Sequence, residues 1–160
     1  MNEQRRRRKF LYVAIGGTFD KLHRGHRKLI KEALYIGDFI ILGLTSDKMV
    51  NAYKKHEVTN FEERKRVLED FLEKEGAKER VQIFKINNPY GPSISDDRIG
   101  AIVVSTETEP SATEINDLRK KRGLKPLRKI VIGMVLAEDG LPISNTRMRR
   151  GEIDEEGKRL

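Results

Sequence analysis

The sequence contains no cysteine and no tryptophan, and only 6% of its 160 residues are aromatic. Without cysteine the chain forms no disulfides and offers no thiolate ligands, and with only three histidines a structural zinc site is not expected. No apolar stretch approaches the roughly 20 residues that span a bilayer, and no apolar signal-peptide core follows the basic N-terminus. These absences predict a cytoplasmic protein without a membrane segment.

The length fits one domain, and the 37% of apolar residues come in short runs that suit a single core. We expect a domain over residues 10–150, a basic extension at 1–9 and a polar tail at 151–160, which is either a short helix or disordered. The net charge of +8 favours anionic partners without separating nucleotides from nucleic acids. Part of that charge is the run from Arg5 to Lys9, which is typical of a solvated extension but also suits RNA or membrane phosphates.

Strand-like and helix-like segments alternate along the chain. Apolar runs predict strands at 10–15, 39–44, 81–86, 101–104 and 130–135. Apolar residues at spacings of three and four predict helices at 24–36, 61–72 and 112–122, with a serine-capped helical turn at 144–150. This order predicts an α/β protein with a Rossmann-like, doubly wound, five-stranded parallel sheet and helices on both faces. Its ligands are expected beyond the carboxyl ends of the strands.

The segment GGTFDKLHRGH, residues 16–26, joins the first expected strand to the first expected helix. Glycines let the backbone approach an anion, and a helix N-terminus presents unpaired N–H groups. Two histidines three residues apart with no acid between them do not fit the zinc motif HExxH, so we reject a zinc site. The candidate phosphate-binding residues of this segment are Gly16, Gly17, Thr18, His23, Gly25 and His26.

Two motifs at opposite ends of the chain resemble those of one superfamily. Thr18 followed by His23-Arg24-Gly25-His26 resembles the T/HxGH signature of the Rossmann-like nucleotidyltransferases. The segment ISNTRMR, residues 143–149, resembles their ISSTxxR motif, although asparagine replaces the middle serine. The resemblance implies that the ATP phosphates are bound from the second motif by Ser144, Thr146 and Arg149.

Within that superfamily, residues 10–150 look most like the archaeal phosphopantetheine adenylyltransferases and the matching domain of animal coenzyme A synthases. The segment NPYGP at 88–92 is similar to the family's DPYGP. A second family pattern, VSEET...IN..R, is similar to Val104-Ser105-Thr106-Glu107-Thr108 together with the Ile-Asn pair at 115–116 and an arginine after it. The resemblance implies acceptor binding by Thr18, Lys54, Lys55, Tyr90 and Arg119. Arg119 is our candidate to replace an arginine that bacterial enzymes carry near the segment aligned with 105–109.

The resemblance also implies the reaction. A phosphate oxygen of 4'-phosphopantetheine attacks the α-phosphorus of ATP, pyrophosphate leaves and dephospho-coenzyme A forms. We expect His26 to contact the transition-state α-phosphate, His23 the ATP phosphates and Thr18 the attacking phosphate. Mg²⁺ should arrive with ATP, held by phosphate oxygens and water, and no protein metal ligand is predicted.

Two alternatives remain. A nucleotidyltransferase of the same superfamily with another phosphorylated acceptor, such as nicotinamide mononucleotide, flavin mononucleotide or glycerol phosphate, would carry the same two signatures. A nucleic-acid-binding protein would use the run from Arg5 to Lys9, but the sequence has neither a stacking-aromatic pattern nor a helix-turn-helix with basic recognition residues. The sequence gives no indication of the oligomeric state.

Overall fold

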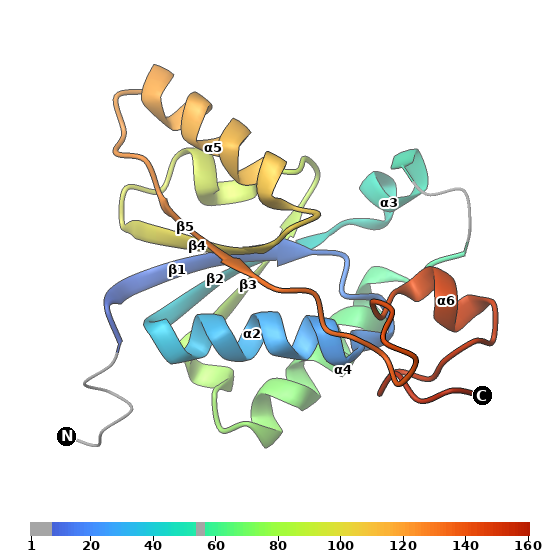
Figure 1. Cartoon of the computed structure of the whole chain (residues 1–160). Coiled ribbons are helices and arrows are strands. Elements are labelled where there is room, and N and C mark those ends of the chain that lie inside the picture. The colour runs from blue at the N-terminus through green and yellow to red at the C-terminus, as the bar shows by residue number, and fades with distance from the viewer. Residues whose placement is uncertain (1–7, 54–56) are drawn as a thin grey trace.

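A computed structural model describes residues 8–53 and 57–160 (Figure 1). Its centre is one sheet of five parallel strands in the order β3-β2-β1-β4-β5. The strands are β1 (Phe10–Gly17), β2 (Gly37–Thr45), β3 (Val81–Ile86), β4 (Ile99–Ser105) and β5 (Arg128–Ile132). The chain moves from the middle to one edge and then to the other, so the strand order reverses beside β1. This confirms the predicted doubly wound parallel sheet.

Helices cover both faces of the sheet, as predicted (Figure 1). The α-helices are α2 (Arg24–Ile36), α3 (Asp47–Tyr53), α4 (Phe61–Lys74), α5 (Glu109–Lys121) and α6 (Asn145–Arg149). Three 3-10 turns join them: η1 (Asp20–Leu22), η2 (Lys78–Arg80) and η3 (Gly91–Ile94). Helices α2 and α4 lie on one face, and α5 with η3 lies on the other. At the carboxyl edge of the sheet lie α3 and α6.

The core has two apolar layers, one on each face of the sheet. Val13 and Ile15 of β1 pack with α2 and α4, whereas Ala14 between them packs with α5. In β2, Leu42 packs in the layer with α2 and α4, and Ile41 packs in the layer with α5. Alternate side chains of a strand point to opposite faces, so a strand covered on both faces needs an almost continuous apolar run. The apolar runs therefore marked the central strands correctly.

Several boundaries differ from the sequence predictions, and one helix was not predicted. The last strand ends at Ile132 rather than at residue 135, because Gly133 and the residues after it turn toward the carboxyl edge and line a pocket. Strand β2 follows α2 without a loop and begins at Gly37. A side chain at this position would place its Cβ atom 2.6 Å from Val13 Cγ2, so the close approach requires glycine. Helix α3 was not predicted, because Val50 is its one buried residue and its apolar face is too small to detect.

The polar tail packs against the domain. Ile153 is only 1% exposed and packs with Ala137 and Ile143, and an antiparallel bridge pairs it with Arg159. The backbone N–H of Arg24, at the start of α2, donates to the tail at 3.0 Å. The tail therefore turns back on itself through one antiparallel bridge, and adopts neither of the two conformations that the sequence left open. Over the described part of the chain, every helix is too short or too polar to cross a membrane.

Candidate active site

A pocket of about 450 Å³ lies at the carboxyl edge of the sheet, between the β1–α2 junction and the start of α6. This volume is in the range of small-molecule binding sites. Two segments from near opposite ends of the chain form it, and the N-termini of α2 and α6 both lie in its wall. Its lining includes every residue that we expected to bind ATP, namely Gly16, Gly17, Thr18, His23, Gly25, His26, Ser144, Thr146 and Arg149.

The two histidines of the first motif cap helix α2 reciprocally. The backbone N–H groups of Gly25 and His26 donate to His23 Nδ1 at 3.0 and 3.3 Å. The backbone N–H of His23 in turn donates to His26 Nδ1 at 3.2 Å. The two rings stack with centroids 3.6 Å apart and planes 13° from parallel. This is a capping box made of imidazoles, and it fixes both rings relative to the helix N-terminus.

These contacts assign the tautomer that each ring has when it is neutral. Each Nδ1 accepts a backbone N–H, so a neutral ring carries its proton on Nε2. Burial lowers the pKa of His23 from 6.5 to about 4; a backbone hydrogen bond of His23 opposes this, and the Arg27 guanidinium adds to it. His23 is therefore neutral at physiological pH, and its donor atom is Nε2.

The buried His23 makes the stability of the protein sensitive to acid. Because the pKa of His23 is near 4 in the folded state and 6.5 when unfolded, the unfolded chain binds more protons between these values, and stability falls as the pH falls through this window. Between about pH 7 and pH 5 the loss from this residue is roughly 2 kcal/mol. The prediction is checked by measuring the free energy of unfolding with urea at both pH values.

His23→Asn is the matched control, because asparagine is a good helix cap without a titrating group. We expect this variant to keep most of the stability at pH 7 and to lose less of it at pH 5 than the wild type does. His23→Ala should be about 1 kcal/mol less stable than the wild type at pH 7, but it also lacks the titrating group and should lose less between pH 7 and pH 5. An acid-induced loss in His23→Asn equal to that of the wild type would rule out His23 as its source.

The loop before α2 has strained backbone geometry. Phe19, Lys21 and Leu22 have φ angles of 50°, 60° and 39°, in the left-handed region that non-glycine residues rarely adopt. The buried side chains of Phe19 and Leu22 belong to the core layer under α2, and this packing holds the strained conformation. Such geometry is typical of functional sites that must keep one shape. The loop therefore presents Thr18 in a fixed position.

The second motif begins helix α6. Ser144 caps the helix by accepting the backbone N–H of Arg147 at 3.2 Å, and Arg149 donates to the Thr146 hydroxyl at 3.1 Å. The Arg147 side chain instead bonds to Asp139 and braces the preceding turn, so it does not line the pocket. Arg149 is therefore the arginine of this motif that lines the pocket, and its contact with the ATP phosphates stays a prediction.

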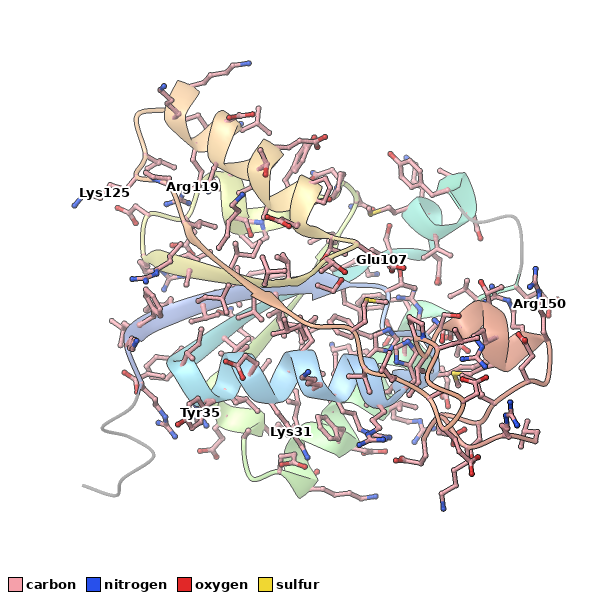
Figure 2. The ribbon with its side chains drawn as sticks, in the orientation of Figure 1. Lys31, Tyr35, Glu107, Arg119, Lys125 and Arg150 are labelled. Atoms are coloured by element: carbon pink, nitrogen blue, oxygen red, sulfur yellow. The ribbon has the colours of Figure 1, made fainter. Side chains whose placement is uncertain are left out.

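Further residues line the pocket that sequence reasoning did not assign to it. Asn145, which replaces the middle serine of the motif, has a buried Oδ1 that accepts no hydrogen bond within the described residues. Met134 and Val135 belong to the wall because β5 ends early. Glu107 is exposed and lies in the turn after β4 (Figure 2). Sequence signals existed for Glu107, which is part of the motif at 104–108, and for Asn145, which is part of the motif at 143–149.

A second, smaller pocket of about 170 Å³ adjoins the first on the α5 face of the sheet. The two pockets share Gly16, Gly17 and Thr108. Tyr90, an expected acceptor residue, lines the second pocket, and its hydroxyl donates to Glu114 at 2.9 Å. Much of the remaining wall is apolar and includes Ile15, Ile41, Ile86, Pro89, Pro92, Ile102, Val104 and Ile115. Lys54 and Lys55 lie outside the described residues.

Arg119 lies elsewhere, in contrast to our expectation that it binds the acceptor. Its side chain is 1% exposed, and it donates to the backbone oxygens of Ser93 at 2.8 Å, Asp96 at 2.9 Å and Lys125 at 2.7 Å. It lies at the end of α5 distant from Glu107 (Figure 2) and lines neither pocket. Arg119 therefore fastens α5 to its neighbouring loops, because its donors already have backbone acceptors inside the fold.

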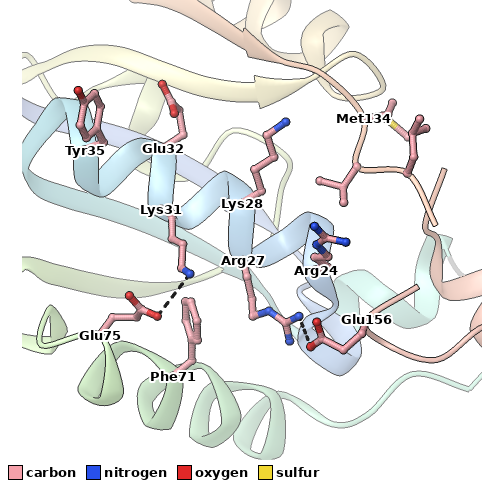
Figure 3. Close-up of a pocket in the computed structure, with 12 residues that line it drawn as sticks. Arg24, Arg27, Lys28, Lys31, Glu32, Tyr35, Phe71, Glu75, Met134 and Glu156 are labelled. Carbon is pink, nitrogen blue, oxygen red and sulfur yellow. Dashed lines mark hydrogen bonds and ion pairs between the residues drawn. The ribbon is translucent and has the colours of Figure 1, made fainter. Parts of the chain in front are cut away.

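A wider groove runs along α2 and shares Met134 and Val135 with the first pocket (Figure 3). It is rich in cationic side chains, but two of them have acidic partners: Arg27 pairs with Glu156 of the tail, and Lys31 pairs with Glu75 at 3.7 Å. The wall of this groove contains neither signature histidine and none of the α6 residues. The groove is therefore a packing feature between α2, α4 and the tail rather than the nucleotide site.

The fold and the pocket together define a class of protein. A doubly wound parallel sheet with two helix N-termini converging on one pocket at its carboxyl edge is the arrangement of a nucleotide-binding α/β enzyme. The family model described as cytidylyltransferase-like matches residues 14–151, and the chain belongs to this family.

Individual relatives define the family more narrowly. The phosphopantetheine adenylyltransferase of Methanopyrus kandleri is 49% identical over 147 residues, which cover 92% of this chain and 93% of that protein. The phosphopantetheine adenylyltransferase of Methanothermobacter thermautotrophicus is 46% identical over 151 residues, covering 94% and 90%. A crystal structure of a protein of unknown function from Archaeoglobus fulgidus matches with a TM-score of 0.69 and 35% identity, covering 76% and 89%. The chain belongs to the phosphopantetheine adenylyltransferases, as its motifs predicted.

Proposed function

We propose that this protein transfers the AMP part of ATP to 4'-phosphopantetheine and forms dephospho-coenzyme A and pyrophosphate. The observation that carries the proposal is the junction of two unlike pockets at Gly16 and Gly17. One pocket combines two helix N-termini with imidazole, hydroxyl and guanidinium groups, which suits a triphosphate. The other is smaller and largely apolar, which suits the arm of an acceptor. We also propose that the protein acts in the cytoplasm, where both substrates are available.

The transfer requires little covalent chemistry from the protein. A phosphate oxygen of the acceptor forms a bond to the α-phosphorus while the bond from that phosphorus to the bridging oxygen breaks, and pyrophosphate leaves with the electron pair. Negative charge grows on the leaving group and on the α-phosphoryl oxygens. We assign His26 Nε2 to the α-phosphoryl oxygens, with His23 Nε2 and the α6 residues Ser144, Thr146 and Arg149 binding the other ATP phosphates. Fixed donors of this kind stabilise developing charge without rearranging during the reaction.

Thr18 is our candidate for placing the acceptor phosphate. It follows the glycine pair that the two pockets share, so a phosphate beside it would lie between the ATP site and the apolar pocket. A pantetheine arm is a thin chain of methylene and amide groups that fits beside Tyr90 and the isoleucine-rich wall. Glycerol phosphate would leave that pocket unused, and the broad ring system of flavin mononucleotide would need a wider one. The pockets therefore favour pantetheine over these two alternatives.

We propose that Mg²⁺ enters with ATP and is bound mainly by phosphate oxygens and water. The carboxylates in the wall of the larger pocket are Asp20 and Glu107. Asp20 is buried and accepts the backbone N–H of Thr59 at 3.3 Å, whereas Glu107 is exposed in the turn after β4. This donor set fits an ion that keeps most of its water and gains at most one protein carboxylate. The ion would supply charge neutralisation on the phosphates.

Removing divalent metal should therefore abolish pyrophosphate release, and adding Mg²⁺ in excess of the chelator should restore it. Because the metal is expected to bind through the nucleotide, thermal unfolding of the protein without ATP should be the same with and without EDTA. A turnover rate that EDTA leaves unchanged would contradict the proposed role of Mg²⁺.

The proposed function is tested by incubating the protein with Mg-ATP and a panel of phosphorylated acceptors while measuring pyrophosphate release. We expect 4'-phosphopantetheine to give the highest kcat/KM, above nicotinamide mononucleotide, flavin mononucleotide and glycerol phosphate. A higher value for one of these would reassign the acceptor. No release with any acceptor, together with RNA binding that weakens steeply with salt, would favour the nucleic-acid alternative.

A further inference from the structure

Arg64, on α4, is a buried arginine next to the proposed acceptor site. It is 2% exposed, and burying a charged guanidinium is strongly unfavourable unless its donors are paired. Its Nε donates to the Thr59 carbonyl at 2.6 Å, and its Nη2 donates to Asp47 Oδ1 at 3.2 Å. Its Nη1 donates both to the Thr18 carbonyl at 3.0 Å and to the Thr45 hydroxyl at 3.3 Å. One side chain therefore contacts three separate segments around the site, at residue 18, at residues 45–47 and at residue 59.

The contact with Thr45 sets the direction of a hydroxyl chain. Thr45 Oγ1 accepts from Arg64, and its own O–H donates to Thr18 Oγ1 at 3.0 Å. The Thr18 hydroxyl is thus the acceptor in this bond, so its own proton is directed to a different acceptor. Thr18 lines the nucleotide pocket, where a phosphate oxygen would be that acceptor. The chain from Arg64 to Thr18 therefore orients a hydroxyl donor for a phosphate.

Arg64 also holds the backbone of the loop that begins at Thr18. The Thr18 carbonyl that it binds precedes Phe19, where the strained left-handed loop begins with φ of 50°. The Thr59 carbonyl belongs to a segment that is also held through the Thr59 N–H by Asp20, within the same loop. These contacts connect the end of β1 to the segment that leads into α4.

The charge of Arg64 acts in the same direction as its hydrogen bonds. Its ionic partner, Asp47, has a side chain that is 52% exposed, so water weakens its effect on the buried guanidinium. A positive charge under Thr18 favours an anion above it, and the proposed acceptor carries a phosphate. We propose that Arg64 is a positioning residue for the acceptor, which orients the Thr18 hydroxyl through Thr45 and fixes the loop that carries it. This inference rests on the proposed function, because it takes Thr18 to meet the acceptor phosphate.

Arg64→Lys tests the proposal, because lysine keeps the charge but lacks the planar fork that contacts several segments at once. We expect kcat/KM for the acceptor to fall by about tenfold or more, since a charge-assisted network is lost, while KM for ATP changes by less than about twofold. Arg80→Lys is the matched control. The Arg80 guanidinium also donates to three backbone oxygens, those of Leu34, Gly37 and Asp38, but at the opposite end of β2. The Arg80→Lys substitution should lower the melting temperature without changing KM for the acceptor.

Thr45→Val and Thr45→Ser test the hydroxyl chain even if Arg64→Lys does not fold. Valine should lower kcat/KM for the acceptor by about tenfold, serine should retain it, and Thr45→Val combined with Arg64→Lys should be less than additive. Equal acceptor constants for Arg64→Lys and Arg80→Lys, or normal turnover by Thr45→Val, would overturn the inference. All variants are compared with the acceptor that the wild type uses best. If the wild type is inactive with 4'-phosphopantetheine, the proposed acceptor is wrong, and the role of Arg64 is still decided with the acceptor that is used.

Discussion

His26→Ala should lower kcat by about 10²-fold or more while the protein remains folded, because it removes a fixed donor aimed at charge that develops in the transition state. Nε2 is the ring's donor atom, since Nδ1 accepts the backbone N–H of His23. The measurement is kcat for pyrophosphate release at saturating ATP and acceptor, together with thermal unfolding of each variant. A folded His26→Ala enzyme with a nearly normal kcat would disprove the assignment.

A matched variant separates catalysis from helix capping. His26 occupies the third position of α2, where glutamine completes a capping box by accepting the N–H of the capping residue. His26→Gln should therefore unfold at nearly the wild-type temperature, whereas His26→Ala should be less stable by about 1 kcal/mol. Both should show a low kcat, because a glutamine amide turned toward His23 no longer places a donor where Nε2 was. If kcat were low in His26→Ala but nearly normal in the more stable His26→Gln, the role of His26 would be purely structural.

Arg149→Ala should raise KM for ATP by about 10- to 100-fold, the range expected when one charge-assisted hydrogen bond to a phosphate is lost. Arg149 lines the pocket and donates to Thr146 of the same motif. The neighbouring Arg150 is exposed and lies outside the pocket wall, which makes Arg150→Ala the matched control for the loss of one positive charge from α6 (Figure 2). KM for ATP should change by less than about twofold in this control.

Arg149→Ala and Arg150→Ala together also distinguish a direct contact with ATP from long-range electrostatic attraction. If Arg149 acted only through the general positive charge of the protein, both variants would weaken ATP binding similarly, and the difference would shrink in high salt. A direct contact predicts that the difference between the two variants persists. Equal KM values for ATP in Arg149→Ala and Arg150→Ala would contradict the placement of Arg149 on the nucleotide.

The central strands and the residues of the pocket at the carboxyl edge could be predicted because their signals are local in sequence. A strand covered on both faces must be apolar throughout, and a loop that approaches a phosphate needs glycine and hydroxyl residues next to a helix start. Both motifs also lie after strands of a parallel sheet, which places them at the same edge. The sequence therefore indicated that Thr18, His26 and Arg149 would meet, although they lie far apart in the chain.

The roles of the buried arginines could not be predicted, because long-range contacts decide them. Arg64 resembles a residue of a charged helix face until Thr18, Thr45 and Thr59 provide acceptors from three other segments. Arg119 resembled an acceptor ligand by position, but backbone carbonyls from two loops occupy its donors. In both cases the partners become neighbours only after the chain folds.

Segments with weak local signals were also predicted poorly. The tail has one buried apolar side chain, Ile153, so no periodic pattern indicated its bridge with Arg159. His23 was expected to contact ATP, but the cap that it forms on α2 was not foreseen, because histidine is an uncommon capping residue. Lys54 and Lys55 remain predictions, since they lie outside the described residues.

A crystal structure of the protein with Mg²⁺ and the non-hydrolysable analogue α,β-methylene ATP tests most directly whether both ends of the chain form one nucleotide site. We expect the triphosphate between the N-termini of α2 and α6, with His26 Nε2 close to the α-phosphate and the Arg149 guanidinium on the β- or γ-phosphate. A nucleotide that contacts one helix start and not the other, or that lies in the wider groove along α2, would contradict the claim that both ends form one site.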